Sequence, residues 1–152
     1  MRRYAFIFFA IALLAAGPAR AADQRVIKVL PHLLDLDGRH ALSPSLFDRD
    51  AYQALLRAQP DKQSGIRYDV QWRSETPGEF VLRLELLGQI EEGRPIRKTL
   101  ETTVTSEHRR AQWSAVSFTG AEFKKFGPIV AWRVSLWYGT ERLAKQQSFL
   151  WD

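Results

Sequence analysis

Two neighbouring segments with regular alternation of apolar and polar residues constrain the fold of this chain more than any other feature. In residues 66–73 every second side chain is apolar, and the series ends at Trp72. After the turn-forming stretch SETPGE, the same period of two runs from Phe80 to Leu86. Because successive strand side chains point to opposite faces, the pattern predicts two half-buried antiparallel strands.

Five further segments complete a predicted all-β fold. Residues 26–36 form a predicted strand that contains Pro31, which favours an edge position or a bulge because proline donates no ladder hydrogen bond. The others are separated by turn-forming residues and cover residues 96–105, 112–118, 129–138 and 143–151. Seven strands at such spacing are typical of an antiparallel β-sandwich.

One helix is predicted between the first two strands. Residues 43–62 carry apolar side chains at spacings of three and four, and Pro60 ends the pattern. We expect about three turns, with Asp48 as the N-cap. The face expected to cover an end or edge of the sandwich consists of Phe47, Ala51, Leu55 and Ala58. Residues 119–126 are predicted to form a short helix or turn.

The amino-terminal residues have the composition of a signal peptide. A basic start, MRR, precedes an apolar run at residues 4–16, and Ala19-Arg20-Ala21 forms a small-residue cleavage pattern. The run is shorter than the roughly 20 apolar residues that cross a bilayer. An uncleaved anchor is the alternative.

Cleavage after residue 21 predicts a single mature domain at residues 22–152. It divides into a first strand region (22–42), a helical insertion (43–62) and the remaining strands (63–152). No second apolar segment approaches membrane length, so we expect no membrane span after cleavage and a periplasmic or secreted protein.

Charge and cysteine content exclude several classes of function. Loss of the three leader arginines leaves 19 basic against 17 acidic residues, a net charge of +2. No basic cluster with interleaved aromatic residues occurs, so nucleic acid is not an expected partner. The absence of cysteine excludes disulfides, thiol catalysis and thiolate metal sites.

The order of strands from Ile66 to Trp151 resembles a fibronectin type III or immunoglobulin-like domain. The resemblance rests on the tryptophan that ends YDVQW and on the loop FTGAEFKKFGP before the strand AWRVSL. It implies a seven-stranded antiparallel sandwich. The paired cysteines of immunoglobulins are absent, and Trp132 stands where a tyrosine is expected. The whole chain also resembles uncharacterised exported bacterial proteins, which implies no particular activity.

The one cluster with metal-ligand chemistry consists of His32, Asp35, Asp37 and His40. A turn at Asp37-Gly38, with the chain doubling back through residues 39–42, would place Asp35 opposite His40. Such a cross-strand pair gives both residues a structural role. Metal sites need three or four converging ligands, and only two of these residues are placed together, so we predict neither a metal nor another cofactor. The four residues stay the candidates if a metal binds.

No catalytic residues are predicted. The chain lacks a Gly-x-Ser-x-Gly motif, and His108 lies in a polar, loop-like stretch. Glu85 and Glu101 point outward from their predicted strands, where solvated charges are usual. A small hydrolase with a carboxylate site stays an alternative, because carboxylate separation is a tertiary property.

Three tryptophans lie within residues 129–151. The period of two predicts that Val130, Trp132, Val134 and Leu136 face the core, whereas Trp137 faces outward with Arg133. A two-residue turn at Gly139-Thr140 would place Arg142 opposite Trp137. This arrangement predicts either a stacked structural pair or a recognition site, so the candidate partner-binding residues are Trp137, Arg142 and Arg133. The last strand is expected to be an edge guarded by Lys145 or to contain a bulge, and the pattern leaves its register open.

These observations predict an exported, non-catalytic binding or assembly module of the bacterial envelope. The favoured partner is another protein, because β-sandwiches associate through edges and faces. A carbohydrate-binding module with exposed aromatic residues is the first alternative, and the small hydrolase is the second.

Overall fold

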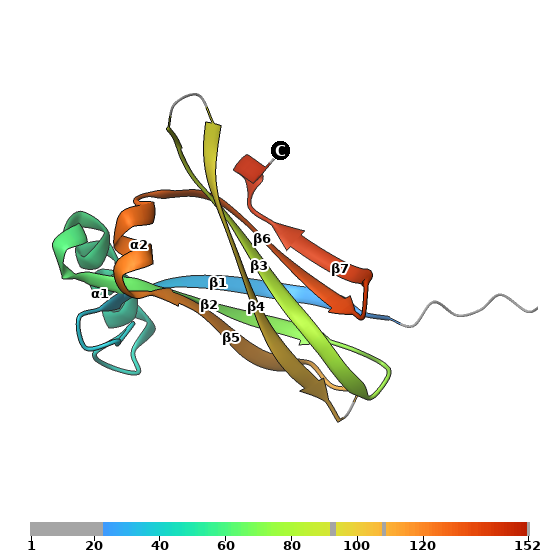
Figure 1. The fold of residues 1–152 in the computed structure, drawn as a ribbon. Coiled ribbons are helices and arrows are strands. Elements are labelled where there is room, and N and C mark those ends of the chain that lie inside the picture. The colour runs from blue at the N-terminus through green and yellow to red at the C-terminus, as the bar shows by residue number, and fades with distance from the viewer. Residues whose placement is uncertain (1–22, 92–93, 108, 152) are drawn as a thin grey trace, which may run out of the picture.

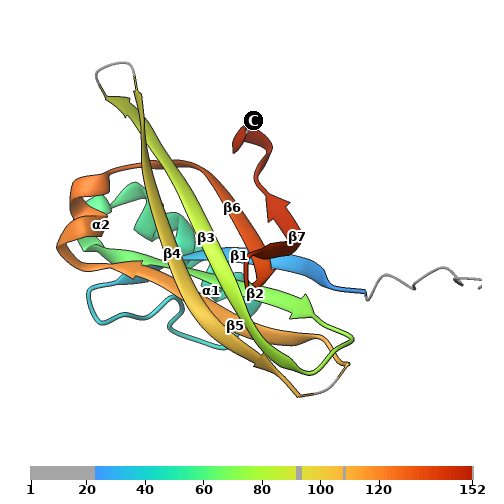
Figure 2. The same cartoon turned by 45° about the vertical axis from the view of Figure 1, so that its right-hand side comes forward.

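Two antiparallel β-sheets face each other across a shared apolar core (Figures 1 and 2). The computed structural model describes residues 23–91, 94–107 and 109–151. The predicted signal peptide at residues 1–21 and His108 lie outside these described residues.

The strands are arranged in a sheet of three and a sheet of four, which confirms the seven predicted strands. The first sheet has the order β1 (Arg25–Asp35), β2 (Gln63–Arg73), β5 (Gln112–Thr119). The second has the order β4 (Arg94–Ser106), β3 (Gly78–Glu91), β6 (Ile129–Tyr138), β7 (Glu141–Gln147). Both β1 and β7 are edge strands, as predicted, although the register shifts of β1 lie near its two ends and not at Pro31.

The alternating segments supply the centre of the core. The buried apolar residues of β2 and β3 are Ile66, Tyr68, Val70, Trp72, Phe80, Leu82, Leu84 and Leu86. Burial of one large apolar side chain is worth about 1.5–3 kcal/mol. The face of each strand that carries these residues is therefore the one that turns toward the core. Trp72 is fully buried and also donates from Nε1 to Ser114 Oγ at 3.0 Å.

Two details of the last strands differ from expectation. Val134 and Leu136 are buried, but Val130 is 45% exposed and Ala131 is buried in its place. A register shift between Leu87 and Gly88 of β3 changes the phase at the start of β6. The predicted strand at 143–151 is also too long, because β7 ends at Gln147 and the chain turns into the 3-10 helix η2 (Phe149–Trp151).

The predicted helix forms as α1 (Leu46–Ala58), but its N-cap is Ser45 and not Asp48. Ser45 Oγ accepts from the backbone N–H of Asp48 at 3.4 Å. Asp48 lies in the first turn, where its carboxylate accepts from Ser43 Oγ at 2.8 Å. A serine three residues before an acidic residue is a familiar start signal, and here it places the helix start earlier than expected.

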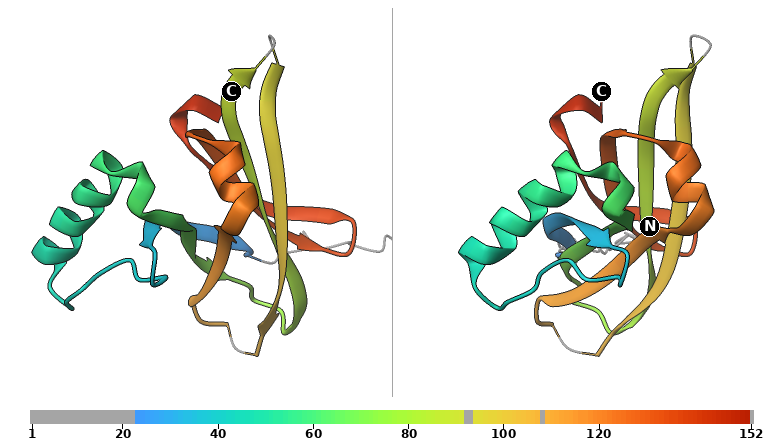
Figure 3. Two further views of the ribbon diagram at one scale, coloured as in Figure 1. Left: turned by 60° about the vertical axis from the view of Figure 1, so that its left-hand side comes forward. Right: turned by 90° about the vertical axis from the view of Figure 1, so that its left-hand side faces the viewer.

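The helix α1 projects from one end of the sheets (Figure 3) and packs mainly on β1. Its buried residues are Gln53 and Leu56, so the expected inward face was wrong. After α1, the 3-10 helix η1 (Pro60–Lys62) leads into β2. No helix in the described ranges is long and apolar enough to cross a membrane.

The short helix or turn predicted at residues 119–126 forms the second helix, α2 (Gly120–Phe126). It lies at the same end of the sheets as α1 (Figure 1). Phe123 and Phe126 are buried, with ring centroids 5.7 and 5.5 Å from that of Phe118. An ion pair between Lys98 and Glu122 fastens α2 to β4.

Candidate functional site

The outer face of the four-stranded sheet contains the predicted partner-binding residues. Trp137 and Arg142 are cross-strand partners, as the predicted turn required. The cation above the Trp137 ring is nevertheless Arg83 of β3, whose guanidinium carbon lies 4.1 Å from the ring centroid. The expected stacking of Arg142 on Trp137 was therefore replaced by a contact from the other neighbouring strand. Trp137 Nε1 also donates to the buried Ser135 Oγ at 2.8 Å.

Arg133 also makes its contacts with other residues of the same chain. Its guanidinium donates twice to Glu85, at 2.7 and 2.8 Å, and lies 4.6 Å from the Trp151 ring centroid. The hydrogen bonds to Glu85 raise the pKa of Arg133 above its usual value. Arg83 likewise donates to Glu101 at 2.6 Å. Arg83 and Arg133 are therefore held by internal partners, which gives them a structural role.

The predicted metal candidates divide into two separate groups. His32 Nδ1 lies 3.0 Å from Asp69 Oδ2, and the His32 and His40 ring centroids are 5.0 Å apart. Burial and the nearby Arg67 lower the pKa of His40. No group of three or more His, Asp or Glu side chains in the part of the chain described is arranged to hold a metal ion.

Asp35 belongs to the second group, and the expected Asp35–His40 pair does not form. The chain does not double back as a strand after Asp37-Gly38, so His40 does not face Asp35. Instead Asp35 accepts from Tyr52 Oη at 2.6 Å, from Arg39 Nε at 3.0 Å and from the backbone N–H groups of Asp37 and Arg39 at 2.9 and 2.8 Å. Burial alone would raise the pKa of Asp35, but these donors outweigh it and lower the pKa to about 2.

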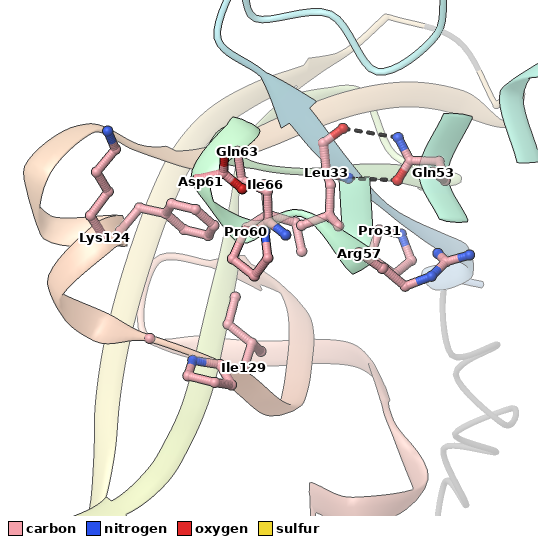
Figure 4. Close-up of a pocket in the computed structure, with 13 residues that line it drawn as sticks. Pro31, Leu33, Gln53, Arg57, Pro60, Asp61, Gln63, Ile66, Lys124 and Ile129 are labelled. Atoms are coloured by element: carbon pink, nitrogen blue, oxygen red, sulfur yellow. Dashed lines mark hydrogen bonds between the residues drawn. The ribbon is translucent and has the colours of Figure 1, made fainter. Parts of the chain in front are cut away.

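A groove of about 780 Å³ lies at the end of the sheets, between η1 and α2 (Figure 4). Its apolar lining consists of Pro31, Leu33, Pro60, Ile66, Phe123, Pro128 and Ile129. Arg57 and Lys124 lie on opposite sides of it in Figure 4. Asp61 is the one acidic residue of the lining, so the groove does not contain a pair of carboxylates.

A second surface at this end is apolar and exposed. The outward residues of α1 share one face of the helix, at spacings of three and four, and form what we call the α1 stripe: Phe47, Ala51, Ala54, Leu55 and Ala58. Phe47 is 81% exposed and Leu55 is 42% exposed. Leu36, Leu42 and Leu46, which are also exposed, lie in the same part of the chain. The sequence pattern identified this face, but it faces solvent and not the core.

Trp113 on β5 is the tryptophan that is exposed among the described residues, at 51%. Its ring makes no aromatic contact with another described residue, in contrast to the Trp72–Phe80 pair at 5.8 Å. It therefore does not form part of a two-ring platform within the described ranges.

Comparison with known proteins adds no family to these observations. No protein-family model matches the chain, and no curated protein is significantly similar to it. What defines the protein is its architecture: two antiparallel β-sheets with a projecting helix that carries an exposed apolar stripe.

Proposed function

We propose that this protein is an exported, non-catalytic binding or assembly module of the bacterial envelope, with the α1 stripe as its docking surface. The observation that carries the proposal is the exposure of Phe47 and Leu55 on one helical face. Contiguous exposed apolar surface on a soluble domain marks an interaction site more often than isolated exposed residues do. An amphipathic helix is also a common element of protein recognition.

The fold is compatible, by analogy, with a binding or assembly module. Seven strands in sheets of three and four are compatible with a fibronectin type III or immunoglobulin-like domain, which we propose as the finer fold assignment. Domains of this architecture serve many functions, so the argument for binding rests on the surface and not on the fold.

The signal-like leader supports export to the periplasm or beyond. Intact mass measurement of the exported protein tests this part of the proposal. A chain that begins at Ala22 is expected, whereas Met1 retained on membrane-bound protein would contradict it.

A carbohydrate-binding role is the second candidate, and Trp113 is the observation in its favour. This residue is 51% exposed, whereas the rings of Trp137 and Trp151 are covered by arginines. Sugar rings stack on exposed aromatic faces, but a single isolated ring offers less area than the α1 stripe. A carboxylate-dependent hydrolase is less supported, because Glu85 and Glu101 are paired with arginines.

Site-specific photo-cross-linking separates the first two functions. A photoreactive phenylalanine analogue replaces Phe47 in one variant and Trp113 in a matched control, and the exported protein is irradiated in intact cells. A protein-binding role through α1 predicts a cross-linked protein product from position 47 and none from position 113. Products from position 113 alone, or retention of the chain on a glycan matrix that Trp113→Ala abolishes, would contradict the proposal.

A further inference from the structure

We propose that the occupant of the α1 stripe is the same helix of a second copy, packed antiparallel about a two-fold axis. This inference rests on the proposed function, because it names the partner of the surface identified there. It is carried by the spacing of the stripe and by the charges beside it.

The apolar positions have the spacing of a two-helix seam. Phe47, Ala51, Ala54 and Ala58 follow one another at intervals of four, three and four residues. A two-fold axis across the middle of this series brings Phe47 against Ala58 of the second copy, and Ala51 against Ala54. The one large side chain of the seam, Phe47, then meets the small Ala58, which permits interdigitated packing. The three alanines also allow the helix backbones to approach closely.

The charges beside the seam are complementary only in this orientation. Asp50 and Arg57 lie on the same flank of the stripe, two helical turns apart. In an antiparallel pair, the same flank of each helix meets, so Asp50 of each copy faces Arg57 of the other. The symmetry produces this pair twice. A parallel pair brings opposite flanks together and places Asp50 beside Leu55, where it has no cationic partner.

Both charged side chains are available for such contacts. Asp50 has a side chain that is 76% exposed, and its ion pair with Arg49 is a long contact of 3.6 Å. Arg57 is exposed and forms no ion pair within 4.0 Å with another described residue, although it borders the groove. The antiparallel arrangement also opposes the two helix macrodipoles, which is the favourable orientation.

The expected dimer is weak. The helix α1 has 13 residues, so it is about 20 Å long at a rise of about 1.5 Å per residue. An interface made by one such helix from each copy lies at the small end of specific protein interfaces, below about 1,200 Å². Association is therefore expected to depend on concentration and to be reversible.

Charge reversal provides the test, with sedimentation velocity of the exported chain measured over a wide range of concentration. The wild-type chain is expected to shift from monomer to dimer as concentration rises. Asp50→Arg and Arg57→Asp each create two like-charge contacts, so each is expected to weaken dimerisation by at least about tenfold. The double variant Asp50→Arg/Arg57→Asp restores opposite charges and is expected to dimerise as the wild type does. Glu79→Arg, an exposed charge reversal on β3, is the matched control and should leave dimerisation unchanged.

The outcomes distinguish this inference from the proposed function. A chain that stays monomeric at every concentration, while position 47 cross-links to a different protein, overturns self-association and retains the docking surface. Loss of both dimerisation and cross-linking overturns both proposals. A double variant that stays as weak as the single variants overturns the antiparallel pairing. Circular dichroism of each variant verifies that the exposed substitutions leave the fold intact.

Discussion

The side-chain amide of Gln53 pairs with both backbone groups of Leu33. The Leu33 N–H donates to Gln53 Oε1 at 2.8 Å, and Gln53 Nε2 donates to the Leu33 carbonyl at 2.9 Å (Figure 4). The same Nε2 donates to the His40 carbonyl at 2.8 Å. A helical side chain thus takes the place of a neighbouring strand on the outer edge of β1. Together with the buried Leu56, it lies on the face of α1 that turns toward the sheets.

Replacement of Gln53 with alanine is expected to destabilise the protein by about 1–3 kcal/mol, because partly buried backbone groups lose their partners. Urea unfolding measures the change. The expected loss is accompanied by faster amide exchange at Leu33. Lys62→Ala, an exposed substitution just beyond α1, is the control and should change stability by less than about 0.5 kcal/mol. Equal stability of the two variants would show that Gln53 does not hold the helix.

Truncation of Trp72 to alanine is expected to cost about 3–5 kcal/mol, the range for removal of a large buried aromatic side chain. Its ring is fully buried, and Ser114 also loses its hydrogen-bond donor. Trp113→Ala is the matched control, because Trp113 lies on the adjacent strand β5 with its ring half exposed. Thermal unfolding of both variants should show a large loss for Trp72 and a small one for Trp113. Similar losses would contradict the assigned strand orientation.

The strands could be predicted because each depends on a local pattern. The backbone pleat turns alternate side chains to one face, so the period of two in residues 66–73 is sufficient to orient Trp72 inward. Register shifts are not visible in such a pattern. The shift beside Gly88 therefore made Val130 appear to be a core residue, although it is exposed.

The candidate site could not be predicted in full, because it depends on contacts between segments that lie far apart in the sequence. The period of α1 predicted an apolar face correctly, but an isolated helix does not specify whether that face meets the core or solvent. The face that meets the sheets carries the buried Gln53 and Leu56, and the contact of a glutamine with Leu33 has no signal in the sequence. Likewise, Arg83 reaches Trp137 diagonally, since the register pairs Arg83 with Ser135.

The Arg83–Trp137 contact predicts a measurable coupling free energy. A double-mutant cycle with Arg83→Met and Trp137→Leu is expected to give about 0.5–1 kcal/mol, the range for an exposed cation–π pair. The corresponding cycle for Arg142 and Trp137 should give no coupling, because Arg142 does not stack on the ring. Chemical denaturation of the single and double variants supplies both values. Coupling to Arg142 in place of Arg83 would contradict the observed geometry.

The lowered pKa of Asp35 predicts that the free energy of unfolding depends on pH under acid conditions. Its pKa of about 2 in the folded protein lies below its usual value of 3.8. A lowered carboxyl pKa stabilises the folded state above the usual pKa, and this contribution is lost as the pH falls from about 3.8 to about 2. Asp35→Asn should therefore be less stable than the wild type near neutral pH, and the difference should shrink as the pH approaches 2.

Tyr52→Phe tests the cause of this shift without removal of the carboxylate. The tyrosine hydroxyl is one of the donors that hold Asp35 ionised, so its loss is expected to raise the pKa of Asp35 in the folded protein. Urea unfolding between about pH 2 and 7 should then show the acid decline of stability beginning at higher pH than in the wild type. Asp61→Asn, an exposed substitution in η1, is the control and should leave the acid decline in place. The preceding variant supplies the contrary outcome. If Asp35→Asn lowers stability by the same amount at about pH 2 and at about pH 7, the charge of Asp35 does not stabilise the turn between β1 and α1. Neutral hydrogen bonds to position 35 would then be sufficient.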